Sequence, residues 1–117
     1  MAEDNNTIFG KILRDEIPSV RVWEDDRCIA FRDVNPAAPT HILVIPRKTI
    51  PTLNHIEESD KELIGHMVWV VGQIAQQEKI AEDGYRMVVN CNARGGQTVY
   101  HLHMHILGGR GLSWPPG

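Results

Sequence analysis

The sequence predicts a single α+β domain over residues 1–117, with about five mainly antiparallel strands, one short helix and one long helix. Short apolar runs rich in β-branched residues recur between turn-forming residues, which is typical of a sheet. A short helical pattern precedes the first of these runs, and one long helical pattern separates the third from the fourth. A chain of 117 residues is long enough to bury one core.

Composition excludes several classes of partner and location. A net charge of −3 argues against a basic nucleic-acid surface, and no apolar run approaches the roughly 20 residues that a membrane span needs. The acidic, polar start is the opposite of a signal peptide. Two cysteines without a disulfide pattern suit a reducing compartment. We therefore expect a cytoplasmic protein with no nucleic-acid or membrane partner.

The first elements are a disordered end and a short helix. Residues 1–6 show no apolar periodicity, so we expect them to be disordered. Thr7 can cap a helix that continues to about Arg14 and is ended by Ile17-Pro18. The apolar positions of this helix recur at helical spacing, at Ile8, Phe9, Ile12 and Leu13.

Three strands are expected next. Residues 20–23 and 28–33 alternate around an acidic turn, which predicts a hairpin. Residues 41–46 are almost continuously apolar, which predicts a central strand buried on both faces. Asp33 and His41 lie at strand ends. The simplest interpretation is that Asp33 is a solvated side chain and His41 a strand-end histidine.

One long helix follows an irregular stretch. Ser59 and Glu62 fit a capping box, and the helical pattern continues to about Lys79. Its apolar stripe is wider than one sheet contact requires. Trp69 lies off that stripe beside His66, so its indole is either exposed or in contact with a second subunit, while His66 reads as structural.

The last elements return the chain to the sheet. Residues 85–90 read as a strand, and residues 91–97 as a turn whose glycines either form a hairpin or expose N–H groups to an anionic oxygen. Residues 100–107 read as the final strand. The Pro-containing residues 111–117 cannot join a ladder and should form an extended arm.

Three histidines at alternate positions of that final strand point to chemistry. In an extended chain His101, His103 and His105 share one face, while the apolar residues between them face the core. Imidazoles suit proton transfer, nucleophilic attack or metal binding. No Asp or Glu follows Gly84, and the cysteines form no C-x-x-C pair, so we expect neither a metal nor another cofactor.

The chain resembles the Hint branch of the histidine triad superfamily, the nucleoside phosphoramidase type. The resemblance covers nearly the whole chain and rests on these stretches: Thr7-Ile8-Phe9-Gly10-Lys11-Ile12, Ala38-Pro39-Thr40-His41, Gly95-Gly96-Gln97-Thr98-Val99-Tyr100, His101 to Leu107, and Trp114-Pro115-Pro116-Gly117. It implies a HIT-like fold, a homodimer with a continuous sheet, and hydrolysis of the P–N bond of purine nucleoside 5'-phosphoramidates through a nucleotidyl-histidine intermediate.

The resemblance also implies catalytic roles. His103 matches the nucleophile that attacks the α-phosphorus, held by the backbone carbonyl of the residue matching His101. His101 and His41 match supporting histidines. His105 and Thr98 match positions near the phosphate and the leaving group, and Thr98 replaces the more usual serine, which keeps the hydroxyl but restricts its rotamers.

Nucleotide-binding residues are implied in the same way. Asp33 matches the carboxylate that binds both ribose hydroxyls, and Asn90 a residue that bonds a phosphate-side group. Gly96 and Gln97 match the nucleotide-binding loop, and Trp114 a residue that reaches the partner's site. The apolar slot around the base is matched by Ile8, Phe9, Ile12, Phe31 and Val34.

Two other functions remain open from the sequence. The transferase branch of the superfamily carries Gln where this chain has His105, so hydrolysis is favoured over transfer. Diadenosine polyphosphate hydrolases also keep three histidines and are the alternative enzyme. A nucleotide-binding adaptor with incidental turnover is the alternative from another class.

Overall fold

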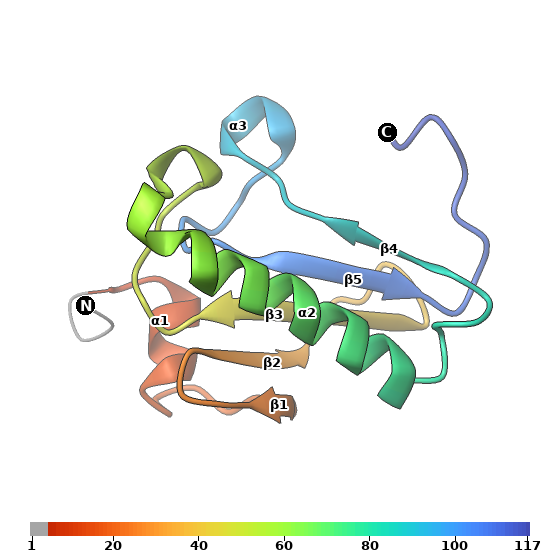
Figure 1. Ribbon diagram of the computed structural model, residues 1–117, viewed down its shortest axis with the longest axis horizontal. Coiled ribbons are helices and arrows are strands. Elements are labelled where there is room, and N and C mark those ends of the chain that lie inside the picture. The colour runs from red at the N-terminus through yellow and green to blue at the C-terminus, as the bar shows by residue number, and fades with distance from the viewer. Residues whose placement is uncertain (1–4) are drawn as a thin grey trace.

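A five-stranded antiparallel sheet with the strand order β1-β2-β3-β5-β4 forms the centre of the molecule, in a computed structural model that describes residues 5–117 (Figure 1). The strands are β1 (Arg21–Glu24), β2 (Cys28–Arg32), β3 (Thr40–Pro46), β4 (Tyr85–Val88) and β5 (Met104–Gly108). The helices are α1 (Ile8–Leu13), α2 (Lys61–Gln77) and α3 (Asn92–Gly95), with 3-10 turns η2 (Leu53–His55) and η3 (Glu58–Asp60). The predicted α+β class is confirmed, and β3 is the central strand, buried almost throughout.

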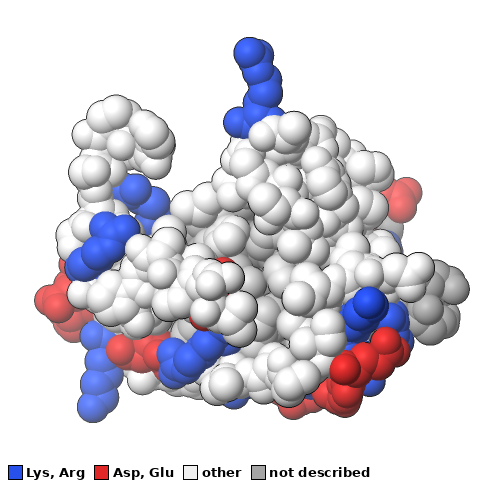
Figure 2. All heavy atoms as spheres, turned by 180° about the vertical axis from the view of Figure 1, so that it is seen from behind, with Lys and Arg blue, Asp and Glu red and all other residues white. Residues whose placement is uncertain are grey.

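The two faces of the sheet carry two separate apolar clusters. Long helix α2 covers one face, where Met67, Val70 and Ile74 pack on β-strand residues such as Val44 and Ile106. Short helix α1 covers part of the other, where its two buried apolar side chains join strand residues. That second cluster consists of Phe9, Ile12, Ile29, Phe31, Leu43 and Ile45. Figure 2 views the molecule from behind, and much of that side is uncharged, with acidic and basic side chains mixed along its lower part.

Asn5 and Asn6 belong to the end that was expected to be disordered, and the structure describes both. Residues 1–4 lie outside the described part of the chain, but Asn5 is described and buried, so the expected disordered end does not include it. Thr7 caps α1 as predicted, because its hydroxyl accepts the Gly10 N–H at 3.1 Å.

The predicted capping box of α2 is wrong. The reciprocal pair is formed by Glu57 and Asp60 in η3, where the Asp60 carboxylate accepts the Glu57 N–H, and not by Ser59 and Glu62. Lys48, at the end of β3, donates to the other oxygen of Asp60. Asp60 therefore joins η3 to α2 and also pairs with a residue distant in the sequence, Lys48.

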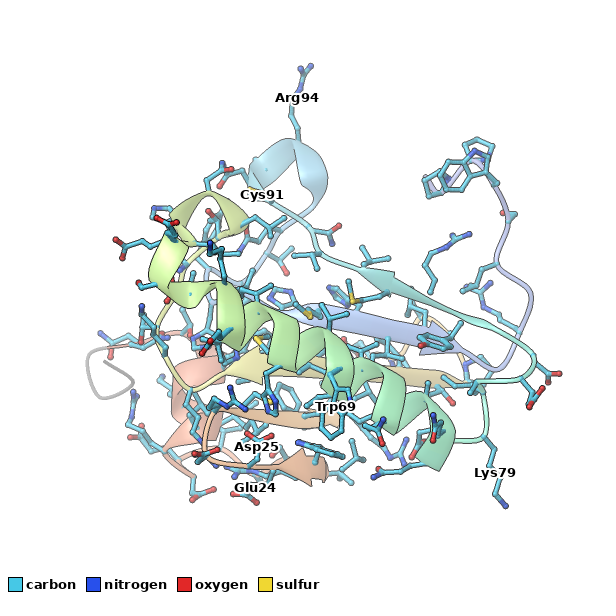
Figure 3. All side chains as sticks on the ribbon, in the orientation of Figure 1. Glu24, Asp25, Trp69, Lys79, Cys91 and Arg94 are labelled. Carbon is cyan, nitrogen blue, oxygen red and sulfur yellow. The ribbon has the colours of Figure 1, made fainter. Side chains whose placement is uncertain are left out.

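Two predicted elements near the histidines differ from the structure. The final strand begins at Met104 and not at Tyr100, and its pairing with β3 ends where Val44 lies opposite Met104. Leu102 donates instead to the Ile50 carbonyl at 2.7 Å. Residues 92–95 form α3 where a simple turn was expected, and Arg94 projects from its tip (Figure 3).

A polar cluster ties α2 to the turn between β1 and β2. Asp25 accepts the indole N–H of Trp23 at 2.8 Å and the Nε2–H of His66 at 2.7 Å. Partial burial alone would raise the pKa of Asp25, but these bonds and those from the turn lower it well below its usual range. Trp69, 55% exposed, stacks on His66 and meets Trp23 edge-on (Figure 3). His66 is structural, as expected, and Trp69 has partners in its own chain.

Within residues 5–117, no helix is long and apolar enough to cross a membrane.

Candidate active site

A pocket of about 280 Å³ opens between α1, the end of β2 and the histidine segment. We call it the triad pocket. Most of the predicted base and catalytic residues meet there: its walls include Ile8, Phe9, Ile12, Phe31, Asp33, Val34, Thr98, His103 and His105. A site of this size, apolar with a few polar groups on one side, suits a small organic ligand with a polar end.

His103 presents one ring nitrogen to the triad pocket. Its Nδ1–H donates to the backbone carbonyl of His101 at 2.7 Å, so its Nε2 carries the lone pair. The ring is also held edge-on by Phe9, with ring centroids 5.0 Å apart. His103 is thereby fixed as a neutral base or nucleophile with a defined direction of attack.

His41 and His105 form a chain of hydrogen bonds in which each donor is defined. His41 Nδ1 accepts the Ala37 N–H at 3.0 Å, so the hydrogen of His41 is on Nε2. That Nε2–H donates to His105 Nδ1 at 2.9 Å, which leaves the His105 hydrogen on Nε2. His105 Nε2 is buried without a hydrogen-bond partner among residues 5–117, and the His105 ring lines the triad pocket. A ligand oxygen or nitrogen could therefore accept this orphaned N–H.

Burial keeps these histidines neutral. It is the largest cause that lowers the pKa of His41, His101 and His103, and the charge of Asp33 opposes it at His41 and His103. The pKa of His105 falls to about 4, because burial is reinforced by repulsion from His103 and His41. At neutral pH the site therefore offers lone pairs and N–H groups and no imidazolium.

Asp33 stands where β2 ends, beside the histidine chain. Its Oδ1 accepts the Asn35 N–H at 2.8 Å, and its Oδ2 lies 3.5 Å from His41 Nε2. Asp33, His41 and His105 thus have the spacing of metal ligands, which the sequence argument missed because Asp33 is distant from the triad along the chain. The donors do not suit a metal, however: His41 Nε2 carries a hydrogen rather than a lone pair, since His41 Nδ1 already accepts from Ala37.

Some predicted nucleotide-binding residues do not line the triad pocket. Asn90 follows β4 and is half-buried, and Trp114 is 80% exposed on the C-terminal arm, away from the pocket of its own chain. The Gly96 N–H is not exposed to a ligand, because it donates to Ala93 at the end of α3. Gln97 is buried and its amide bonds three backbone groups, of Asn92, Pro51 and Val99. As placed, Gly96 and Gln97 shape the loop and do not contact a ligand in the pocket.

Sequence reasoning missed part of the pocket wall. The missed residues are Ile17, Pro18, Ser19, Arg32, Asn35, Leu43 and Val99. Leu43 had a usable signal: in a strand it lies two residues after His41 and so on the same face. The segment after α1 had none, because only folding brings residues 17–19 beside the end of β2.

Comparisons with known proteins decide the family. Residues 14–112 match the HIT domain. The chain belongs to the HIT domain family. The HIT chain is 56% identical over 112 residues to the purine nucleoside phosphoramidase of Escherichia coli strain K12, a match covering 96% of this chain and 92% of that protein. It is 57% identical over 117 residues to an uncharacterised HIT-like protein of Synechococcus elongatus, which covers 100% of both chains.

Solved structures of HIT proteins have the same fold. The crystal structure of a HIT family hydrolase from Legionella pneumophila superposes with a TM-score of 0.94 at 49% identity, covering 96% of this chain and 100% of that one. The HIT-like fold that the motifs predicted is therefore confirmed.

Proposed function

We propose that this HIT protein hydrolyses the P–N bond of purine nucleoside 5'-phosphoramidates through a nucleotidyl-histidine intermediate. The observation that carries the proposal is the orientation of His103, whose Nδ1–H is held by the His101 carbonyl while its Nε2 is left as a lone pair at the triad pocket. The similarity to the Escherichia coli purine nucleoside phosphoramidase supports the choice of substrate.

The first step is attack by His103. The Nε2 lone pair forms a bond to the α-phosphorus as the P–N bond to the amine breaks, so the nucleotide is carried on the imidazole. Positive charge develops on the imidazole ring, and the His101 carbonyl that accepts the Nδ1–H stabilises it. The departing amine takes the bonding electron pair and needs a proton, and His105 Nε2–H and the Thr98 hydroxyl are the donors placed in the same pocket.

The second step regenerates the enzyme. A water oxygen attacks the phosphorus, the P–Nε2 bond breaks, and its electron pair returns to His103. The water proton is released to the base that gave up a proton in the first step or to solvent. Two successive displacements at phosphorus predict net retention of configuration.

The rest of the triad pocket binds the nucleoside. Phe9, Phe31 and Val34 offer apolar surfaces to the base. The Asp33 carboxylate lines the same pocket, 3.5 Å from His41 Nε2, where it can accept bonds from the ribose hydroxyls. Asn90 and Trp114 are assigned by resemblance alone, to the phosphate side and to the partner's site.

The deciding experiment combines trapping with stereochemistry. Rapid quench of adenosine 5'-phosphoramidate turnover, followed by peptide mass analysis, should find AMP on the peptide that contains His103. Hydrolysis of a substrate chiral at phosphorus in labelled water should give retention. Inversion without an adduct would mean that water attacks directly. Parallel assays with diadenosine polyphosphates and nucleotide sugars separate the phosphoramidase from its relatives, and tight nucleotide binding without turnover of any of them would indicate an adaptor.

The protein is also proposed to act as a cytoplasmic homodimer that needs no metal, nucleic acid or membrane. The homodimer is supported by strand β4, which forms an edge of the sheet and exposes Tyr85 and Met87, and by Val68, which is exposed on α2. Pairing of such edges would continue the sheet from one subunit into the next. Light scattering on the purified protein tests it, and a monomer across micromolar concentrations would contradict it.

A further inference from the structure

Asn5 reaches from the start of the described chain to a fully buried histidine. Its Nδ2 lies 2.6 Å from His101 Nδ1, although the two residues are 96 positions apart. Asn5 is 5% exposed and His101 0%. None of the motifs that identify the family includes Asn5.

The hydrogen bonds around Asn5 determine which atom donates. Its Oδ1 accepts both the Thr7 N–H at 2.9 Å and the Thr7 hydroxyl at 2.6 Å, so the amide nitrogen must face His101. His101 Nδ1 therefore accepts. On the other side of the ring, His101 Nε2 lies 2.8 Å from the Pro46 carbonyl, which can only accept. The neutral Nε2–H form of His101 is thus the one that satisfies both contacts.

The surrounding residues hold Asn5 in this place. Arg14 donates to the Asn5 backbone carbonyl at 2.7 Å. Gly10 lets the segment approach α1, because a Cβ at that position would collide with the Asn5 carbonyl oxygen. Contacts with Arg14 and with α1 therefore hold Asn5 in place, with its side-chain amide against His101.

We infer that Asn5 is a positioning residue that, together with the Pro46 carbonyl, fixes the neutral Nε2–H form and the placement of His101, and through the His101 carbonyl the placement of the nucleophile His103. The inference rests on the proposed function for its kinetic consequence. Two bonds link the amide to the reacting ring: Asn5 Nδ2–H to His101 Nδ1, and His103 Nδ1–H to the His101 carbonyl at 2.7 Å. A shift of His101 would turn His103 away from the line of attack.

Charge gives the contact a second consequence. A protonated His101 would point an N–H at the Asn5 amide donor, so Asn5 opposes the imidazolium form. Among the groups packed around His101, His103 is titratable and Phe9 contacts the His101 ring edge-on. The Arg14 cation binds the backbone carbonyl of Asn5. A cation at His101 would disfavour the positive charge that His103 acquires during attack.

The test uses four variants of the full chain, with adenosine 5'-phosphoramidate as the substrate. Asn5→Ala removes the amide, and Gly10→Ala keeps the amide but forces the segment away. Asn5→Asp replaces the donor with an acceptor that favours a protonated His101. Asn6→Ala is the matched control, because the neighbouring Asn6 is exposed.

We expect Asn5→Ala and Gly10→Ala to lower kcat by about tenfold, with little change in KM, and Asn6→Ala to match the wild type. Asn5→Asp should add an inflection to the pH profile, with activity recovering as His101 loses its proton at higher pH. Imidazole ¹⁵N spectra should show His101 as the Nε2–H tautomer in both proteins, because the Pro46 carbonyl still accepts from Nε2, and the His101 Nδ1 signal should shift in Asn5→Ala, because Nδ1 loses its donor.

Wild-type kcat and an unchanged His101 spectrum in Asn5→Ala would overturn the inference. A loss of kcat accompanied by a lower Tm, with the His101 Nδ1 signal unchanged, would also overturn it. The spectra do not depend on turnover. A wild-type protein that fails to hydrolyse the phosphoramidate would therefore reject the proposed function while the role of Asn5 at His101 is still decided.

Discussion

The histidines of the triad pocket owe their chemistry to the backbone groups that face them. The His101 carbonyl places the hydrogen of His103 on Nδ1, and the Ala37 N–H places that of His41 on Nε2. His105 follows from His41, since its Nδ1 must accept. Each ring nitrogen is thereby assigned as lone pair or donor while the imidazoles stay neutral.

This neutrality makes a prediction for the pH dependence of turnover. An ordinary histidine, with a pKa of about 6.5, would lose its lone pair below that pH. Burial lowers the pKa of His103, so its neutral fraction stays high when the pH falls through 6.5. We expect kcat/KM for adenosine 5'-phosphoramidate to stay level there and to decline only at lower pH. A profile already at half its maximum at pH 6.5 or above would contradict this.

Asp33 is predicted to recognise ribose. Asp33→Ala should weaken ribonucleotide substrates by roughly 10- to 150-fold in kcat/KM, because a hydrogen bond to a charged group contributes about 1.5 to 3 kcal/mol. The same variant should treat a 2',3'-dideoxy substrate as the wild type does. Equal losses for both substrates would show that Asp33 acts through its bonds to the Asn35 turn instead.

Metal independence is predicted from the same hydrogen-bond pattern. Asp33, His41 and His105 are close enough to share an ion, but the hydrogen on His41 Nε2 occupies the position that a metal would need. Activity should therefore survive exhaustive chelation. Loss of activity with a chelator and recovery on adding zinc would instead establish a metal site.

At the scale of elements, Ser59 and Asp60 both precede α2, but only Asp60 belongs to a capping box. Asp60→Ala should lower the Tm by about 4 to 8 °C, because it removes the cap of η3 and the partner of Lys48 together. Ser59→Ala should leave the Tm unchanged, since Ser59 is exposed and is not a member of the capping box. Thermal unfolding of both variants checks this, and a larger effect at Ser59 would restore the cap predicted from sequence.

At the scale of the whole molecule, the C-terminal arm does not line the triad pocket of its own chain. Residues after Gly108 leave the sheet, and Arg86 of β4 ties the arm through the Ser113 carbonyl at 2.8 Å (Figure 1). Trp114 then stands 80% exposed. If two chains pair as proposed, this indole can reach the neighbouring pocket.

Deleting residues 113–117 should therefore change selectivity among leaving amines more than affinity for AMP. The measurement is kcat/KM for a series of phosphoramidates of different amine size, beside the dissociation constant of AMP. Unchanged kcat/KM values across the series, or a fully active monomer, would show that the arm does not contribute to the active site.

The sequence alone determined the fold class, the central strand and the candidate histidines, for physical reasons. Alternating histidines in an extended chain must share a face, and the continuously apolar residues 41–46 must be buried on both sides. These are local rules that need no knowledge of distant partners. The match of motifs along the chain then gave the family and, by resemblance, the roles of Asp33 and His103.

Only the tertiary structure decided what depends on contacts between distant segments. The pairing of β5 with β3 ends at Met104, Lys48 binds Asp60 at the cap of η3, and Asn5 contacts His101 from 96 residues away. The tautomers of His41 and His103 likewise depend on which backbone group folding brings to each ring nitrogen. Periodicity describes the face on which a side chain lies, but a hydrogen bond depends on the partner that meets it there.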